Sequence, residues 1–311
     1  MEIILSTLNQ LAFLFLMIGV GYLLSVTGVL DQRAAGVLSK LEITVLIPVL
    51  ILLTFIEQFN LGTLKTAWQP FLWGGILLAV LVLPSMGLVR FCAKDRDLRN
   101  IYLYGLCFSN FSFMGNALIS ALYPDCFFEY LIFSLPLWIA VFAWATPFLL
   151  MPRVERRSGK DWVKVFLNPL FISIPVGMLL GLLEVPLPDF AYQALDATAS
   201  SMSPVAMLLT GICVGAVDFK KTLRDKGFYF FSVFRLLIFP LAGLGILALV
   251  SLPVAVEIAI IIVLALPPGL NAIIIPAACG KDIREAAGMT ILSHLFSCVT
   301  IPIMLFLYEL I

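Results

Sequence analysis

Residues 264–276 read LALPPGLNAIIIP, and this stretch places two prolines and a glycine in the middle of an apolar segment that spans residues 255–279. Proline has no backbone N–H, and its ring clashes with the preceding helical turn, so Pro267 and Pro268 predict a helix that is broken near its centre. A break leaves backbone N–H and C=O groups without helical partners, and lipid cannot supply them. The sequence therefore predicts an interrupted helix whose centre faces protein or water.

The composition of the whole chain is that of a membrane protein. Of its 311 residues, 62% are apolar and 12% are charged, whereas soluble proteins have about 45–50% apolar and about 25% charged residues. The net charge is zero and the 19 basic residues are scattered, which does not suit a nucleic-acid groove. A chain this poor in charge is expected to be covered by lipid.

The cysteines and the apolar N-terminus each have a simple interpretation. The six cysteines form no CxxC pair and no metal-ligand spacing, so we predict no metal site, no cofactor and no disulfide framework. The apolar N-terminus has the length of a signal peptide, but it carries Glu2 and lacks a basic start. We therefore interpret it as the first membrane helix.

A membrane-spanning helix needs about 20 mostly apolar residues. The windows that meet this requirement are 6–26, 37–57, 68–91, 101–123, 127–150, 165–184, 198–218, 228–251, 255–279 and 286–309. Basic residues collect in cytoplasmic loops, and 17 of the 19 lie in alternate loops if both chain termini are outside the cytoplasm. The prediction is an all-α, multi-pass cell-membrane protein with ten transmembrane helices and extracytoplasmic termini.

The two halves of the sequence resemble each other. A shift of 156 residues places Gly21 on Gly177 and Pro48 on Pro204, and a shift of 155 places Asn116 on Asn271. We predict a first five-helix repeat at 1–150, a cytoplasmic linker at 151–164 and a second repeat at 165–311. Because five is odd, the second repeat is inverted, as in secondary transporters that bind substrate between the repeats. Duplication of a purely structural unit is the alternative.

Polar and helix-breaking residues lie at the centre of the fourth and ninth windows. The fourth window has no central proline, so its predicted break depends on glycine and polar side chains. The start of a half-helix offers N–H donors to an anion, and asparagine amides both donate and accept. Interhelical hydrogen bonding is the alternative role of each asparagine. The predicted substrate-binding residues are Asn110, Ser112, Gly115, Asn116, Pro267, Pro268, Gly269 and Asn271.

Three ionisable residues also fall inside the predicted spans. Arg235 either extends to the cytoplasmic surface or holds a substrate anion. His294, the only histidine, either bonds a neighbouring helix or carries a coupled proton. Glu42 is close to the inner end of the second helix, and we expect it to be solvated there.

The segment NFSFMGNALI at 110–119 resembles the fourth helix of the auxin efflux carrier family, which includes bacterial malate and malonate permeases. Residues 266–282 and 290–302 resemble the family's ninth and tenth helices, although His294 replaces a small hydroxyl residue and Ala117 replaces a proline. The resemblance implies a fold like that of bile-acid symporters, in which broken helices 4 and 9 cross. It also implies a static scaffold of helices 1, 2, 6 and 7, and a moving domain.

Together these observations predict a secondary active transporter of a small organic anion, such as malate, malonate or an auxin-like acid, working by alternating access. The coupling ion, proton or sodium, is left open, and so is a homodimer. A cation/proton antiporter needs carboxylates at the two breaks, and the sequence has none there. The chain contains no GxGD, HExxH or GxSxG motif, so we do not expect an enzyme. A membrane ligand sensor remains an alternative.

Overall fold

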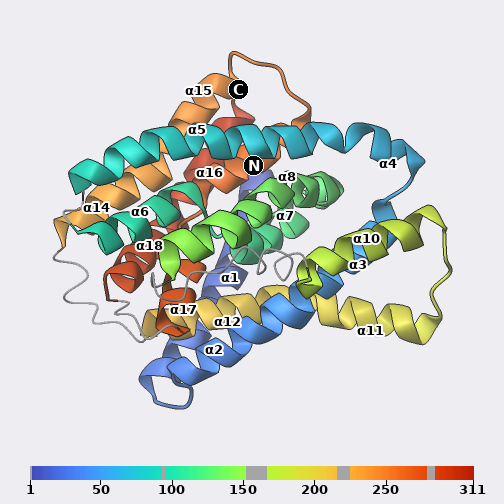
Figure 1. The fold of residues 1–311 in the computed structure, drawn as a ribbon, viewed down its shortest axis with the longest axis horizontal. Helices are drawn as coiled ribbons and strands as arrows, with labels where there is room; N and C mark the ends of the chain where they lie inside the picture. Colours follow the sequence, from blue (N-terminus) through green and yellow to red (C-terminus); the bar gives the residue numbers. More distant parts are fainter. Residues whose placement is uncertain (1, 93–94, 152–166, 216–224, 279–283) are drawn as a thin grey trace.

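The fold is all-helical in the computed structural model, which describes residues 2–92, 95–151, 167–215, 225–278 and 284–311 (Figure 1). The first half comprises α1 (Glu2–Val26), α2 (Gln32–Leu41), η1 (Glu42–Leu46), α3 (Ile47–Gln58), α4 (Leu61–Thr66), α5 (Trp68–Cys92), α6 (Arg96–Cys107), η2 (Phe111–Gly115), α7 (Asn116–Leu122), η3 (Pro124–Cys126), α8 (Phe127–Ala140) and η4 (Val141–Leu150). The second half comprises α10 (Pro169–Leu182), α11 (Asp189–Ser200), α12 (Met202–Gly215), α14 (Lys226–Val233), η6 (Phe234–Ile238), α15 (Phe239–Leu247), α16 (Val254–Ala265), α17 (Asn271–Ala278) and α18 (Arg284–Glu309).

Six helices in the described residues are long and apolar enough to cross a membrane, and four shorter apolar helices accompany them. The long ones are Arg33–Gln58, Trp68–Arg90, Pro124–Leu150, Asp189–Gly215, Lys226–Leu247 and Glu285–Glu309. The four shorter ones include one half of each interrupted segment, Phe111–Leu122 of the fourth and Val254–Ala265 of the ninth. The ten-span inverted repeat stays a prediction, and the 151–164 linker lies almost entirely outside the described residues.

Two helix boundaries differ from the predicted windows. The seventh helix begins at Asp189 rather than at 198, because polar α11 continues directly into α12. The second begins at Gln32, where the Asp31 side chain caps its first N–H groups. Glu42 therefore lies ten residues inside a helix, is fully buried, and has no hydrogen-bond partner for either carboxylate oxygen. The expectation of a solvated Glu42 is wrong, because α10, α11 and α12 pack against η1.

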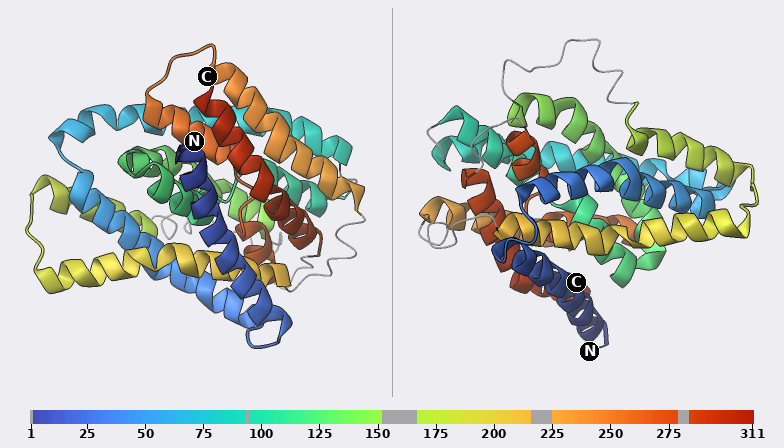
Figure 2. Two further views of the ribbon diagram at one scale, coloured as in Figure 1. Left: turned by 180° about the vertical axis from the view of Figure 1, so that it is seen from behind. Right: turned by 90° about the horizontal axis from the view of Figure 1, so that it is seen from below.

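Two helix pairs cross at glycines. A side chain at Gly21 of α1 would meet the backbone of Leu208 in α12, and one at Gly177 of α10 would meet the backbone of Leu52 in α3. Both members of the first contact lie 156 residues from their counterparts in the second. The same close approach therefore occurs twice, each time between one helix of the first half and one helix of the second half. Figures 1 and 2 show α3 beside α10 and α1 crossing α12.

The surface and the interior have the chemistry expected of a protein in lipid. Large apolar side chains are exposed along the helices, including Leu16 and Leu83 at 64% and 74%. Such exposure over many helices marks a membrane-facing surface. The start of α1 and the end of α18 lie on the same side of the molecule (Figures 1 and 2). The side chains of the fourth and ninth segments are mostly buried, and this region contains the candidate site.

Candidate functional site

The fourth and ninth segments are both interrupted, and their interruptions pair with each other. α6 ends at Cys107 and η2 begins at Phe111, whereas α16 ends at Ala265 and α17 begins at Asn271. The Asn110 N–H donates to the Pro267 carbonyl at 2.7 Å, and the Gly269 N–H donates to the Phe108 carbonyl at 3.0 Å. These bonds flank an antiparallel bridge between Ser109 and Pro268. Each break thus supplies main-chain partners that lipid could not provide.

The break in the fourth segment lies earlier than predicted. Phe108 is extended, with φ −118° and ψ 105°, so the helix stops directly before Ser109 and Asn110 and not at Gly115. Gly115 is not at the break but inside the π-helix η2. Its role is close packing, because a Cβ there would meet the Tyr130 hydroxyl and the Leu266 side chain. The Tyr130 hydroxyl donates to the Phe111 carbonyl at 2.7 Å and holds η2 in place.

Arg235 lies at the crossing and does not extend to the surface. Its side chain is fully buried in η6. Nε donates to the Leu266 carbonyl at 3.1 Å, and the two terminal nitrogens donate to Leu106 at 3.2 Å and Val263 at 2.6 Å. These carbonyls end α6 and α16, where a helix leaves C=O groups unpaired and carries partial negative charge. The Arg235 guanidinium therefore caps both α6 and α16. The expectation that this side chain extends to the cytoplasmic surface is wrong.

Asn110 and His294 contact each other at the same break. The Asn110 Nδ2 atom lies 3.2 Å from His294 Nε2, and His294 Nδ1 lies 2.8 Å from the Thr290 carbonyl oxygen. Both side chains are buried, at 0% and 3% exposure. Thr290, one helical turn earlier, is the hydrogen-bond partner of one ring nitrogen, and Asn110 is the partner of the other. His294 thus bonds a neighbouring segment, as one of its two predicted roles requires.

Several of the predicted site residues hold buried polar atoms without a hydrogen-bond partner. These include Oδ1 of Asn110 and of Asn271 and Nδ2 of Asn116. Asn271 begins α17 and lies within hydrogen-bonding reach of the Tyr104 hydroxyl. Ser112 is also buried, and no side chain caps the first turn of η2. Native interiors pair nearly all buried polar groups, so this concentration of unpaired atoms marks the crossing as a candidate binding site.

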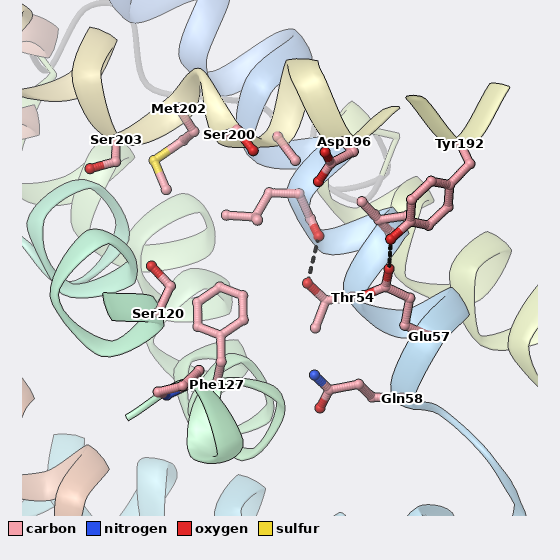
Figure 3. A pocket seen from close by; sticks show the side chains of 14 residues that line it. Thr54, Glu57, Gln58, Ser120, Phe127, Tyr192, Asp196, Ser200, Met202 and Ser203 are labelled. Carbon is pink, nitrogen blue, oxygen red and sulfur yellow. Dashed lines mark hydrogen bonds between the residues drawn. The ribbon is translucent and has the colours of Figure 1, made fainter. Parts of the chain in front are cut away.

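A polar pocket of about 360 Å³ lies beside the fourth segment (Figure 3). α3, α11 and α12 line one side, and α7, η3 and α8 line the other. Ser120 contributes to the lining from α7, one helical turn beyond Asn116. At the other end the Tyr192 hydroxyl donates to a Glu57 carboxylate oxygen at 2.8 Å. The pocket therefore extends from an exposed carboxylate to α7, the helix that begins at Asn116.

Sequence reasoning missed three residues of this region. Tyr104 and Tyr130 present hydroxyl groups to the ninth and fourth segments, and Thr290 holds an unpaired buried oxygen. The tyrosines carried no distinguishing signal, because aromatic residues are common in apolar helices. Ser109 belongs to the central polar cluster of the fourth window but was not predicted to bind substrate, and its buried hydroxyl also has no partner.

The comparisons with known proteins agree with this architecture. Residues 6–305 match the family model described as a membrane transport protein, which corresponds to the auxin efflux carrier family. Because the match covers nearly the whole sequence, the chain belongs to this family, and it is a multi-pass membrane protein of a transporter class. A search of curated proteins returned no match.

Proposed function

We propose that the protein is a secondary active transporter of a small carboxylate and binds this anion where the fourth and ninth segments cross. The observation that carries the proposal is the set of donors at the start of the half-helix formed by η2 and α7. The uncapped first turn of η2 and Asn116 Nδ2 are donors, and donors at a helix start attract an anion. Arg235 adds positive charge beside them, although three carbonyls already accept from its guanidinium.

The proposed mechanism is alternating access across the cell membrane. In this proposal α1, α2–α3, α10 and α11–α12 form a static scaffold, and the crossing segments move with the remaining helices. The pocket in Figure 3 supports this division, since it lies between α3 and α11–α12 on one side and α7–α8 on the other. Glu57 and Lys65 belong to the end of α3 and to α4, which the distribution of basic residues assigns to the outside. The pocket would then be the outer entrance.

The test begins with a thermal-shift screen of the purified protein against malonate, malate and aromatic acetic acids, with and without sodium. Counterflow of the labelled acid in proteoliposomes then separates a carrier from a sensor. Asn110→Ala and Asn271→Ala are expected to abolish counterflow while remaining folded. Asn60→Ala is the matched control, because Asn60 only caps the exposed helix α4. Normal counterflow in both site variants would refute this binding site.

A sodium-coupled carrier is the second candidate. Two buried carboxamide oxygens, on Asn110 and Asn271, and the Ser109 hydroxyl lack partners at the crossing, and oxygen atoms are the ligands of hard cations. Sodium-dependent stabilisation in the thermal-shift screen would favour this candidate. The same anion affinity in sodium and choline salts would exclude it.

A further inference from the structure

The hydrogen bonds of His294 fix which ring nitrogen carries its proton. Nδ1 is 2.8 Å from the Thr290 carbonyl oxygen, which can only accept, so Nδ1 must be the N–H donor. In the neutral imidazole Nε2 is then a pure acceptor. Its partner, 3.2 Å away, must donate, and the Asn110 amide therefore turns its Nδ2 toward the ring.

This orientation decides what Asn110 presents to the binding site. With Nδ2 bonded to His294, the remaining amide atom is Oδ1, which is buried and has no partner. An unpaired carbonyl oxygen repels a carboxylate. A neutral His294 therefore leaves Asn110 in the orientation that is unfavourable for an anion.

We propose that His294 is a proton-binding site coupled to anion binding through a rotation of the Asn110 amide. The proton enters on Nε2 and converts the imidazole to an imidazolium that donates from both nitrogens. Asn110 then turns about its Cβ–Cγ bond, so that Oδ1 accepts from Nε2–H and the NH₂ group faces the site. Apart from the new Nε2–H bond and the reversed hydrogen bond between Asn110 and His294, no bond is made or broken. The inference rests on the proposed function and specifies its coupling ion as the proton.

The charges around His294 favour joint binding of proton and anion. The titratable groups in the described parts of α18 and of the elements packed against it are Tyr22, Arg96, Asp97, Arg99, Tyr102, Tyr104, Cys107, Cys213, Lys226, Tyr229, Arg235, Glu257, Glu285, Cys298, Tyr308 and Glu309.

The carboxylates among these groups are at helix ends. Glu285 and Glu309 are about 13 Å and 22 Å from His294 along α18, and Glu257 and Asp97 lie in the first turns of α16 and α6. The fixed charge at the crossing is the buried Arg235 cation. A protonated His294 adds a second positive charge at the crossing, and the bound carboxylate is its counter-ion. The proton and the anion therefore each strengthen the binding of the other.

The histidine is unique in the sequence, so its state can be observed without any substitution. The protein is labelled with ¹⁵N-histidine, purified through a tag without histidine, and studied in lipid by solid-state NMR near pH 7.5. Without anion, the expected spectrum has a protonated Nδ1 and an unprotonated Nε2. With saturating malonate, or with the acid that the thermal-shift screen selects, both nitrogens are expected to be protonated. An unprotonated Nε2 in the anion-bound protein would overturn the proposal.

Calorimetry in two buffers of different ionisation enthalpy supplies the second measurement. The wild type is expected to take up about one proton per anion, so its affinity falls about tenfold per pH unit above neutrality. His294→Gln is expected to remove proton uptake, whereas Glu42→Gln, which alters a buried carboxyl group in η1, keeps it. Anion binding without proton uptake, or uptake that persists in His294→Gln, refutes the coupling but leaves the carrier function intact. Failure of every small carboxylate to bind refutes the proposed function and this inference with it.

Discussion

Replacement of Arg235 by methionine tests whether one buried cation holds both interrupted helices. Methionine fills a similar volume, but it leaves the carbonyls of Leu106, Val263 and Leu266 without their donors. Hydrogen bonds to a charged group contribute about 1.5–3 kcal/mol each. Relief from burying the guanidinium offsets part of that loss. We expect a net destabilisation of about 3–5 kcal/mol, since the three bonds share one group and do not add independently.

The assay is thermal unfolding in detergent, followed by the fluorescence of the five tryptophans and by size-exclusion chromatography. For a chain of this size, 3–5 kcal/mol corresponds to a decrease of about 6–10 °C in unfolding temperature. Arg235→Lys keeps the charge, but a single ammonium cannot reach three separate carbonyls, so an intermediate decrease is expected. Arg90→Met, at an exposed position in the last turn of α5, is the control. An unfolding temperature of Arg235→Met within about 2 °C of the wild type would refute the argument.

Three further predictions concern packing, burial and pH. Gly115→Ala should destabilise the protein by about 1–3 kcal/mol, because the added Cβ meets the Tyr130 hydroxyl. Gly87→Ala is the control, because a Cβ there meets nothing within 4 Å. Equal unfolding temperatures of the two variants would contradict this prediction. Glu42→Leu should stabilise the protein by about 1–2 kcal/mol by removing two buried unpaired oxygens, and a loss of stability would reveal a partner in the folded protein. The main-chain N–H groups of Leu98 and Asp97 donate to the Asp95 carboxylate that caps α6, and they hold the pKa of Asp95 below its ordinary value. Its contribution to stability is therefore complete above about pH 4 and is lost as the pH falls through that lowered pKa, so Asp95→Asn should flatten the acid limb of unfolding temperature against pH.

The broken ninth helix was predictable because its cause is local. Pro267 and Pro268 remove two N–H groups from any helix that contains them, whatever surrounds it. The family could also be recognised from short segments near these residues, and the match over 6–305 confirms it. Local chemistry of this kind can be read without knowing the fold.

The break in the fourth helix and the environment of Arg235 were not predictable in the same way. Phe108 and Asn110 leave the helix because Gly269 and Pro267, more than 150 residues away, complete their hydrogen bonds. The acceptors of Arg235 likewise lie 28, 31 and 129 positions away in the sequence. Glu42 was misjudged because the start of its helix was placed at 37 rather than at Gln32. In each case tertiary contacts decide the outcome.

The pairing of Asn110 and Gly269 with the opposite segment uses only peptide groups. A peptide group presents the same N–H and C=O whichever amino acid it belongs to, so neighbouring side chains can change while the junction persists. Positions such as Ser109, Asn110 and Asn271 are thus open to exchange without loss of the architecture. We therefore expect that one or two substitutions at the proposed site can change the cargo, and a laboratory selection on these three codons tests that expectation.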